Sequence, residues 1–218
     1  MKPAAQHKDR DRLLNVIFFL ALLIFIVIAV YVNAYPENIF DSHVQQLTRP
    51  LASPALLPFW TRLTFFGSVE FLFPAYVIFI VISIWQQKVR FGLSLAGVAI
   101  GGFLSVELLK QIFKRHRPPT PLIPNVIDYS FPSGHSTSSF IFCAVLSYSL
   151  WHMPLSVSLR IAGMSLLILL VCSTGLSRIV LAVHYPTDVA AGFCLGTLWS
   201  IVWYWFIHKR NRYEGSDK

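Results

Sequence analysis

Two histidines in this sequence have neighbours that suit them for nucleophilic attack and for proton transfer. Asp188 follows His184 by four residues, and a carboxylate that holds one imidazole nitrogen leaves the other nitrogen free to attack. We expect the two to meet if a helical turn begins near Pro186. His135 follows Pro132-Ser133-Gly134 at the expected start of a helix, where it can donate a proton. The sequence thus offers one candidate nucleophile and one candidate general acid.

Basic residues accompany these histidines. Lys110 and Arg117 are seven residues apart, so they share a face if their helix continues that far. Lysine supplies a point charge and arginine a planar fork that suits phosphate oxygens, and Arg178 supplies a second guanidinium. The free N–H groups of Ser133 and Gly134 at a helix start add an anion-binding nest. These groups together predict a site for a phosphate or a similar anion.

Each cluster also has a simpler interpretation. The cations alone are equally typical of a solvated patch that binds acidic headgroups, and a lone Ser-Gly-His is more often an ordinary capped helix start. A His-x-x-x-Asp pair can bind a metal, but its neighbours here are cations rather than further ligands, so we expect no metal. Taken together, the clusters supply what phosphoryl transfer requires: charge on the equatorial oxygens, an in-line nucleophile and an acid for the leaving oxygen.

The elements that hold these residues are expected to be membrane helices. Of the 218 residues 55% are hydrophobic and 13% are charged, against about 25% charged residues in soluble proteins. Six apolar stretches are long enough to cross a bilayer; they are residues 13–32, 69–85, 91–113, 136–151, 159–176 and 189–207. The first could instead be a signal peptide cleaved near Ala34, although its length favours an anchor. The sequence therefore predicts an all-α polytopic bundle of six transmembrane helices.

The distribution of basic residues orients this bundle. Eleven of the 18 lysines and arginines fall on the side that holds both termini, which we assign to the cytoplasm: Lys2, Lys8, Arg10, Arg12, Lys88, Arg90, Arg160, Lys209, Arg210, Arg212 and Lys218. Five more crowd the opposite, outer face, where an anionic ligand would explain them: Lys110, Lys114, Arg115, Arg117 and Arg178. The net charge of +8 therefore points to a membrane and an anion, and not to nucleic acid.

The remaining segments define the domain boundaries. Residues 1–12 and 208–218 are expected to be cytoplasmic tails on either side of a membrane domain at 13–207. Within it, residues 33–68 contain four prolines, which exclude a seventh span and favour short interfacial helices with Trp60 as a headgroup-level anchor. The three cysteines lie inside apolar runs, which argues against a disulfide framework or a zinc site; they are Cys143, Cys172 and Cys194.

Three ordered motifs resemble the signature of the type 2 phosphatidic acid phosphatase family, whose site architecture is shared with vanadium-dependent haloperoxidases. They are Lys110 with Arg117-Pro118, then Pro132-Ser133-Gly134-His135, then Ser177-Arg178 with His184 and Asp188. The resemblance implies that His184 attacks phosphorus to form a phosphohistidine, that Asp188 orients it, and that His135 protonates the leaving group. It implies no cofactor, and it implies phosphate binding by Lys110, Arg117, Ser133, Gly134 and Arg178.

These observations favour an integral membrane lipid phosphatase, an enzyme that hydrolyses a phosphate monoester or diphosphate of a lipid without a metal ion. Phosphatidic acid, phosphatidylglycerol phosphate and undecaprenyl diphosphate are candidate substrates, and the sequence does not choose among them. A lipid phosphotransferase and a non-catalytic anion-binding, lipid-binding or transport protein are the alternatives. The expected location is a bacterial cytoplasmic membrane with the site on the periplasmic or extracellular face. The expected partners are the bilayer and its lipid phosphates, while the oligomeric state is unknown.

Overall fold

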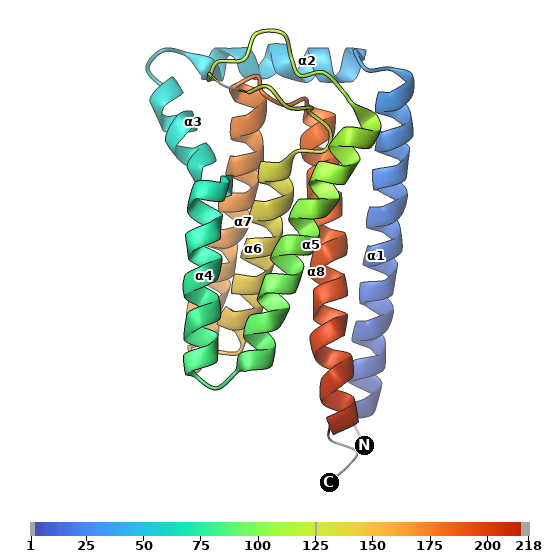
Figure 1. Cartoon of the computed structure of the whole chain (residues 1–218), viewed down its shortest axis with the longest axis vertical. Coiled ribbons are helices and arrows are strands. Elements are labelled where there is room, and N and C mark those ends of the chain that lie inside the picture. The colour runs from blue at the N-terminus through green and yellow to red at the C-terminus, as the bar shows by residue number, and fades with distance from the viewer. Residues whose placement is uncertain (1–2, 125, 215–218) are drawn as a thin grey trace.

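The computed structural model describes the backbone of residues 3–124 and 126–214, and the side chains of residues 9–124 and 126–208. The described residues form helices and loops without strands, which confirms the all-helical prediction. Six long helices run roughly along one axis (Figure 1); they are α1 (Pro3–Ala34), α4 (Val69–Trp85), α5 (Val89–Phe113), α6 (Gly134–Trp151), α7 (Val157–Val180) and α8 (Pro186–Glu214). Four short helices precede α4: α2 (Ile39–Thr48), η1 (Arg49–Ala52), α3 (Leu57–Thr64) and η2 (Phe65–Gly67).

Five described stretches are long and apolar enough to cross a membrane: Asp9–Ala34, Leu57–Trp85, Val89–Phe113, Val157–Val180 and Pro186–His208. They include five of the six expected spans. The sixth expectation falls on α6, whose 18 residues rise about 27 Å but are less apolar. α6 packs against α4, α5, α7 and α8, so much of its surface contacts protein rather than lipid and can carry buried hydroxyls. Burial inside the bundle explains why this helix can carry hydroxyl side chains near its start.

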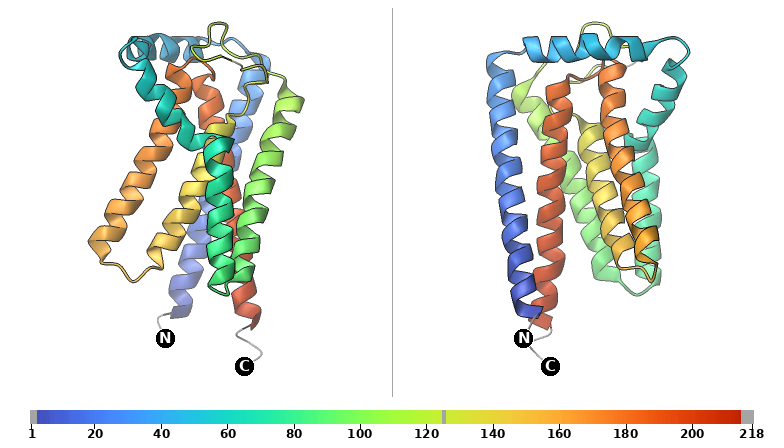
Figure 2. Two further views of the ribbon diagram at one scale, coloured as in Figure 1. Left: turned by 60° about the vertical axis from the view of Figure 1, so that its left-hand side comes forward. Right: turned by 180° about the vertical axis from the view of Figure 1, so that it is seen from behind.

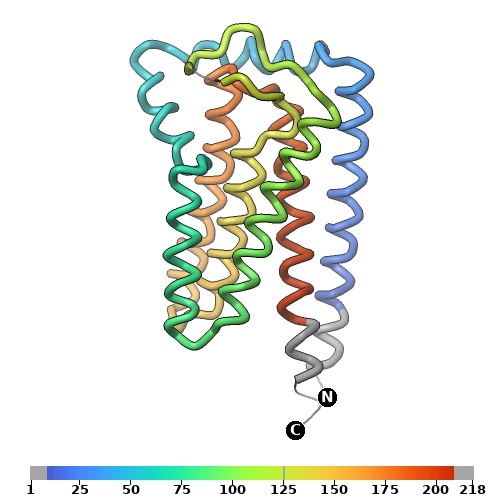
Figure 3. Tube along the Cα trace, in the orientation of Figure 1, coloured from blue at the N-terminus to red at the C-terminus, as the bar shows by residue number. Residues whose placement is uncertain are grey.

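The short helices lie at one end of the bundle. We call it the motif end, because α5 ends there at Phe113, α6 begins there at Gly134 and α8 begins there at Pro186. α2 lies across the tops of the long helices, and the loop of residues 114–133 crosses the same end (Figures 1 and 2). Both the α4–α5 turn and the first coloured turn of α1 lie at the opposite end (Figure 3). The side chains of residues 1–8 and 209–218, which hold most of the two expected cytoplasmic tails, lie outside the described residues.

The expectation for Trp60 is wrong. This side chain is buried, and its indole Nε1 donates to the Leu51 carbonyl at 2.8 Å. It packs with Val180, Leu181 and Val183 beneath α2, where the chain leaves α7. The apolar body of Trp60 therefore joins the short helices to the end of α7, because a loop that folds back over the bundle offers it more apolar contact than the headgroup region does.

Two glycines allow a close approach of helices at the motif end. A Cβ on Gly192 of α8 would lie 2.7 Å from the Ser133 carbonyl oxygen and 2.9 Å from Ser136 Cβ. A Cβ on Gly67 would lie 2.7 Å from Thr174 Cγ2 and 3.1 Å from His135 Cβ. The start of α6, which carries the Ser-Gly-His motif, is thus pressed between α8 and η2 at positions where only glycine fits.

We expect Gly192→Ala to destabilise the protein, because the added methyl meets a backbone oxygen that cannot rotate away. An overpacked contact of this kind costs about 1–3 kcal/mol, which lowers the melting temperature by several degrees in a chain of this size. Thermal unfolding in detergent measures the effect. Gly97→Ala is the matched control, since a Cβ there meets nothing within 4 Å. Equal melting temperatures for the two variants would contradict the close contact.

Candidate active site

A cavity of about 740 Å³ opens at the motif end between α4, α5 and α6. Its polar lining includes six side chains from the sequence motifs and their neighbours, together with Glu70 and Glu107; the six are Lys110, Arg117, Asp128, His135, Arg178 and His184. Its apolar part follows α4 and α5 toward the lipid-facing surface, where Phe73, Ile100 and Phe103 are exposed. The cavity therefore joins a cluster of charges to an apolar opening between α4 and α5.

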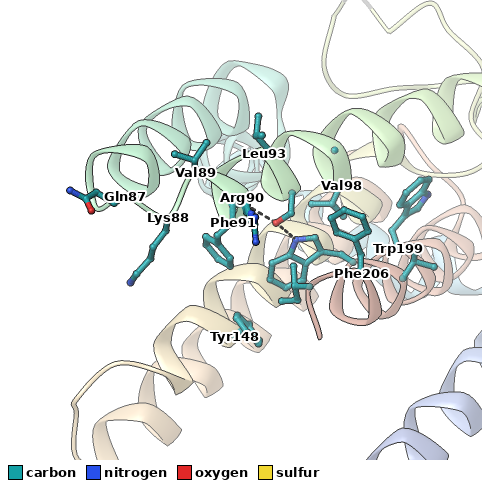
Figure 4. A pocket seen from close by; sticks show the side chains of 15 residues that line it. Gln87, Lys88, Val89, Arg90, Phe91, Leu93, Val98, Tyr148, Trp199 and Phe206 are labelled. Atoms are coloured by element: carbon teal, nitrogen blue, oxygen red, sulfur yellow. Dashed lines mark hydrogen bonds between the residues drawn. The ribbon is translucent and has the colours of Figure 1, made fainter. Parts of the chain in front are cut away.

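A second cavity of about 960 Å³ lies between α5 and α8 toward the opposite end of the bundle (Figure 4). Its walls include Phe91, Tyr148 and Trp203, and the Trp203 indole donates to the Ser94 hydroxyl at 3.0 Å. None of the motif residues lines it. The chemistry that the sequence predicts therefore belongs to the first cavity.

His184 lies in the short connection between α7 and α8 and is 1% exposed. Its Nδ1 is 2.8 Å from the Ser130 carbonyl oxygen, which can only accept, so Nδ1 carries the proton and donates. Nε2 then has the free electron pair, and it accepts from Arg117 Nη1 at 3.1 Å. The imidazole therefore presents Nε2 to the cavity beside a motif cation.

The structure brings Asp188 near His184, as the spacing predicts, although not into a hydrogen bond. α8 begins at Pro186, and Asp188 Oδ2 lies 3.6 Å from His184 Nδ1. That oxygen accepts instead from the Tyr185 backbone N–H at 2.8 Å. The Ser130 carbonyl, which sequence reasoning missed, is the closer partner of the imidazole. Asp188 lies slightly farther from the imidazole, and its role in orienting His184 stays a prediction.

The surroundings of His184 favour its neutral form. Burial lowers the pKa of its imidazole, and the positive charges of Arg117, Arg178 and Lys110 lower it further, to well below the usual value. A neutral imidazole keeps the Nε2 electron pair that nucleophilic attack needs. The same cations that can hold an anion thus also keep the candidate nucleophile deprotonated.

Arg117 reaches the cavity by a route that the sequence did not predict. α5 ends at Phe113, and Lys114 adopts a left-handed conformation (φ 46°), so no helical face joins Lys110 to Arg117. The chain turns over the motif end, and Arg117 is held by the carbonyls of Asp128 (2.8 Å) and Val183 (2.6 Å). The two cations meet through this loop because the helix stops before their predicted common face can form.

Asp128 pairs with both of these cations and was also missed. Its two oxygens lie 2.5 Å from Lys110 Nζ and 2.5 Å from Arg117 Nη2, and Lys110 also pairs with Glu107 at 2.9 Å. Burial opposes the charged form of Asp128, but the hydrogen bond from Lys110 and the charges of Arg117 and Lys110 lower its pKa to about 2. Asp128 is therefore a carboxylate at neutral pH.

Arg178 is the buried cation of the site. It is 4% exposed, and its Nη1 donates to Thr64 Oγ1 of α3 at 2.7 Å. Its Nε has no hydrogen-bond partner, and among the described residues no carboxylate forms an ion pair with it. A buried guanidinium without a counter-ion is costly, so its place on the cavity wall favours an anionic ligand there.

The Ser-Gly-His motif contributes unequally to the cavity wall. Gly134 and His135 line it, and no described residue hydrogen-bonds the His135 ring. Ser133 is fully buried behind them, where its hydroxyl caps α6 by accepting from the Ser136 N–H at 3.4 Å. Its backbone N–H donates to the Asp188 carbonyl at 3.0 Å. Ser133 therefore builds the start of α6, and its role toward a phosphate stays a prediction.

Two of the five outer-face cations do not line the cavity. Lys114 is exposed, while Arg115 is buried in ion pairs with Asp41 of α2 and Asp188 of α8. Asp41 was another missed residue; its signal was one of two carboxylates, with Glu37, in an apolar segment with prolines. The described residues contain no group of three or more His, Cys, Asp and Glu that could hold a metal ion.

Comparisons with known proteins agree with this arrangement. A model of the PAP2 superfamily matches residues 87–212. Phosphatidylglycerophosphatase B of Bacillus subtilis (strain 168) is 28% identical over 177 residues, which are 81% of this chain and 87% of that protein. Decaprenylphosphoryl-5-phosphoribose phosphatase of Mycobacterium tuberculosis (strain ATCC 25618 / H37Rv) is 36% identical over 105 residues, 46% of this chain and 52% of that protein.

Solved structures show the same fold. The crystal structure of a transmembrane PAP2 type phosphatidylglycerolphosphate phosphatase from Bacillus subtilis has a TM-score of 0.81 and 28% identity, covering 88% of this chain and 96% of its own. LpxE from Aquifex aeolicus has a TM-score of 0.62 and 24% identity, covering 78% and 98%. The family model spans more than half of this chain and includes all three motifs, so the chain belongs to the PAP2 superfamily.

Proposed function

We propose that this protein hydrolyses a phosphate monoester or diphosphate of a membrane lipid through a phosphohistidine. Membership of the PAP2 superfamily, with relatives named as phosphatases, makes it a phosphoric ester hydrolase. The observation that carries the mechanism is the meeting of a neutral His184 and the unpaired Arg178 on one cavity wall. A non-catalytic anion-binding or transport protein needs the cations but not this nucleophile.

The proposed reaction has two steps. His184 Nε2 attacks phosphorus while the bond from phosphorus to the leaving oxygen breaks, and His135 gives that oxygen its proton. His135 then takes a proton from water, whose oxygen attacks the phosphohistidine and releases phosphate and a neutral His184. Lys110, Arg117 and Arg178 stabilise the charge on the non-bridging oxygens in both steps. The dianionic phosphate favours the protonated His135 that the first step needs.

The cavity suits a substrate with a hydrocarbon tail. Phe73 and Phe103 flank its apolar part, and both are exposed on the surface where lipid would lie. A lipid phosphate could therefore place its headgroup on the cations and leave its chains between α4 and α5, entering sideways. Phosphatidylglycerol phosphate is supported by the Bacillus subtilis relatives, and phosphatidic acid and undecaprenyl diphosphate share the same headgroup chemistry.

The proposed location is a bacterial cytoplasmic membrane, with all six long helices crossing, both termini in the cytoplasm and the motif end outside. The matched relatives named above are bacterial. The described basic residues Lys88, Arg90 and Arg160 lie at the opposite end, which the excess of basic residues in cytoplasmic loops assigns to the cytoplasm.

We expect His184→Ala to lower phosphate release by about 10³-fold or more, because no other group at the site replaces the lost nucleophile. Purified protein in detergent with EDTA is assayed on phosphatidic acid, phosphatidylglycerol phosphate and undecaprenyl diphosphate. His116→Ala is the matched control, since this histidine is exposed and does not line the cavity. Phosphate release by His184→Ala at the wild-type rate would show that His184 is not the nucleophile. Loss of wild-type activity in EDTA, with recovery on addition of zinc or magnesium, would contradict a metal-free reaction.

The lowered pKa of His184 predicts the acid side of the pH profile. Protonated His184 cannot attack, so kcat/KM should hold as the pH falls through 6.5 and decline only below that value. Removing the nearest positive charge, as in Arg117→Met, raises the pKa of His184 and moves this decline to higher pH. The substrate ionises in the same way with both proteins. A difference between their two pH profiles therefore reports an ionisation of the enzyme. Coincident profiles would show that another group controls the decline.

A cysteine at position 127 should react with an impermeant maleimide added to intact cells, because Ile127 is 98% exposed at the motif end. A cysteine at Gln86, in the α4–α5 turn, should react only after the membrane is opened. Both are placed in a chain whose Cys143, Cys172 and Cys194 are alanine. The reverse labelling pattern would invert the proposed orientation.

A further inference from the structure

A network of buried charges joins the interfacial helix α2 to the catalytic end of α8. Arg115 Nη2 donates to Asp41 Oδ2 at 2.7 Å, and Arg115 Nη1 donates to Asp188 Oδ1 at 2.6 Å. All three side chains are 3% exposed or less. Thr187 ties the carboxylate of Asp41 to the start of α8 with its hydroxyl (2.7 Å) and its backbone N–H (3.0 Å).

Arg115 is not available to a substrate phosphate. Its Nε and Nη2 also donate to the Pro36 carbonyl at 3.2 and 2.7 Å, and its Nη1 donates to Thr187 Oγ1 at 2.8 Å. The guanidinium lies 4.1 Å from the centre of the Tyr185 ring, and Arg115 does not line the cavity. Its charge and its hydrogen bonds are used entirely inside the protein.

Such a network is weak evidence for stability alone. Removing charges from water is costly, and apolar side chains of similar size often stabilise a protein as well as a buried ion pair does. A guanidinium between two carboxylates does fix the orientation of both carboxylates and the net charge of the three groups. With both carboxylates ionised in their ion pairs with Arg115, two negative charges and one positive charge leave one net negative charge beside His184.

That remaining charge lies where the proposed reaction needs it. Asp188 Oδ2 is 3.6 Å from His184 Nδ1, and phosphorylation at Nε2 makes the imidazole positively charged. Arg115 holds one oxygen of Asp188, and the Tyr185 N–H holds the other, so the carboxylate cannot rotate away. The Asp188 carbonyl also accepts from Ser133 N–H, which links this point to the start of α6.

We propose that Asp41 and Arg115 are positioning residues for the His184 nucleophile, acting through the orientation and the single negative charge of Asp188. The proposal rests on the proposed phosphohistidine mechanism. It gives the segment of residues 33–68 a role in the reaction: α2, through Asp41, fixes the guanidinium that holds Asp188. Neither residue touches the substrate.

The test is a charge-balanced double variant. Arg115→Met leaves two buried carboxylates, Asp41 and Asp188, without the guanidinium between them, so one of the two takes a proton. Asp188 then no longer has a fixed charge or a fixed orientation. We expect kcat to fall about 100-fold while KM stays within about threefold, since the phosphate-binding cations are unchanged. Adding Asp41→Asn leaves Asp188 as the one carboxylate of the cluster, so the single negative charge lies on Asp188 again, and should recover about tenfold of the lost kcat. Arg49→Met, at an exposed arginine of η1, is the control.

If the network had a purely structural role, the double variant would have a lower kcat than Arg115→Met, because it loses more contacts. Thermal unfolding of every variant separates lost folding from lost positioning, and Arg115→Lys, which keeps the charge, covers the case that Arg115→Met does not fold. An unchanged kcat in Arg115→Met, or a double variant no faster than the single one, would overturn the proposal. An inactive wild-type protein would instead count against the proposed function.

A second readout does not depend on turnover. Diethyl pyrocarbonate acylates neutral imidazole nitrogens, and mass spectrometry measures the rate at His184 and at His135 separately. Arg115→Met should slow acylation of His184 by several-fold and leave His135 within about twofold, and adding Asp41→Asn should restore the His184 rate. Equal rates at His184 in all variants would contradict the positioning role even if the natural substrate differs from those named above.

Discussion

The structure depends on gathering several largely buried positive charges on the wall of one cavity. Lys110, Arg117 and Arg178 converge on one cavity, and each additional cation makes the burial of the others more costly. The protein offsets this cost with Asp128, which bridges two of them, and leaves Arg178 without a carboxylate. The residual positive charge favours an anionic ligand and the neutral form of His184, so one electrostatic arrangement suits both the proposed binding and the proposed attack.

A second, separate group of charges lies behind His184, the proposed nucleophile. Arg115 and its two carboxylates contact the other face of the His184 connection, away from the cavity. The imidazole therefore lies between a positive cavity wall and a net negative cluster. This polarity suits the role that we propose for His184, which is neutral before attack and positively charged once phosphorylated. Burial makes both fields strong, because the surroundings screen them little.

The bundle determines how these groups can approach one another. Glycines at positions 67 and 192 let η2 and α8 press against the start of α6, and the apolar body of Trp60 holds the short helices against the end of α7. The long helices around α6 free it from contact with lipid over much of its surface, so it can carry the hydroxyls and the histidine that the site requires. The same helix contacts thus pack the bundle and set the geometry of the site.

The sequence alone determined the helical class, the long apolar segments and the motif residues, because hydrophobic length and residue type are local properties. It also placed Asp188 near His184, since four residues make about one helical turn. It could not show that Lys114 turns left-handed and ends the common face of Lys110 and Arg117. Nor could it show which carboxylate pairs with which cation: Asp41 lies 74 residues from Arg115 in the chain. Only the tertiary structure decides such pairings, because burial and distance between charges arise when remote segments pack together.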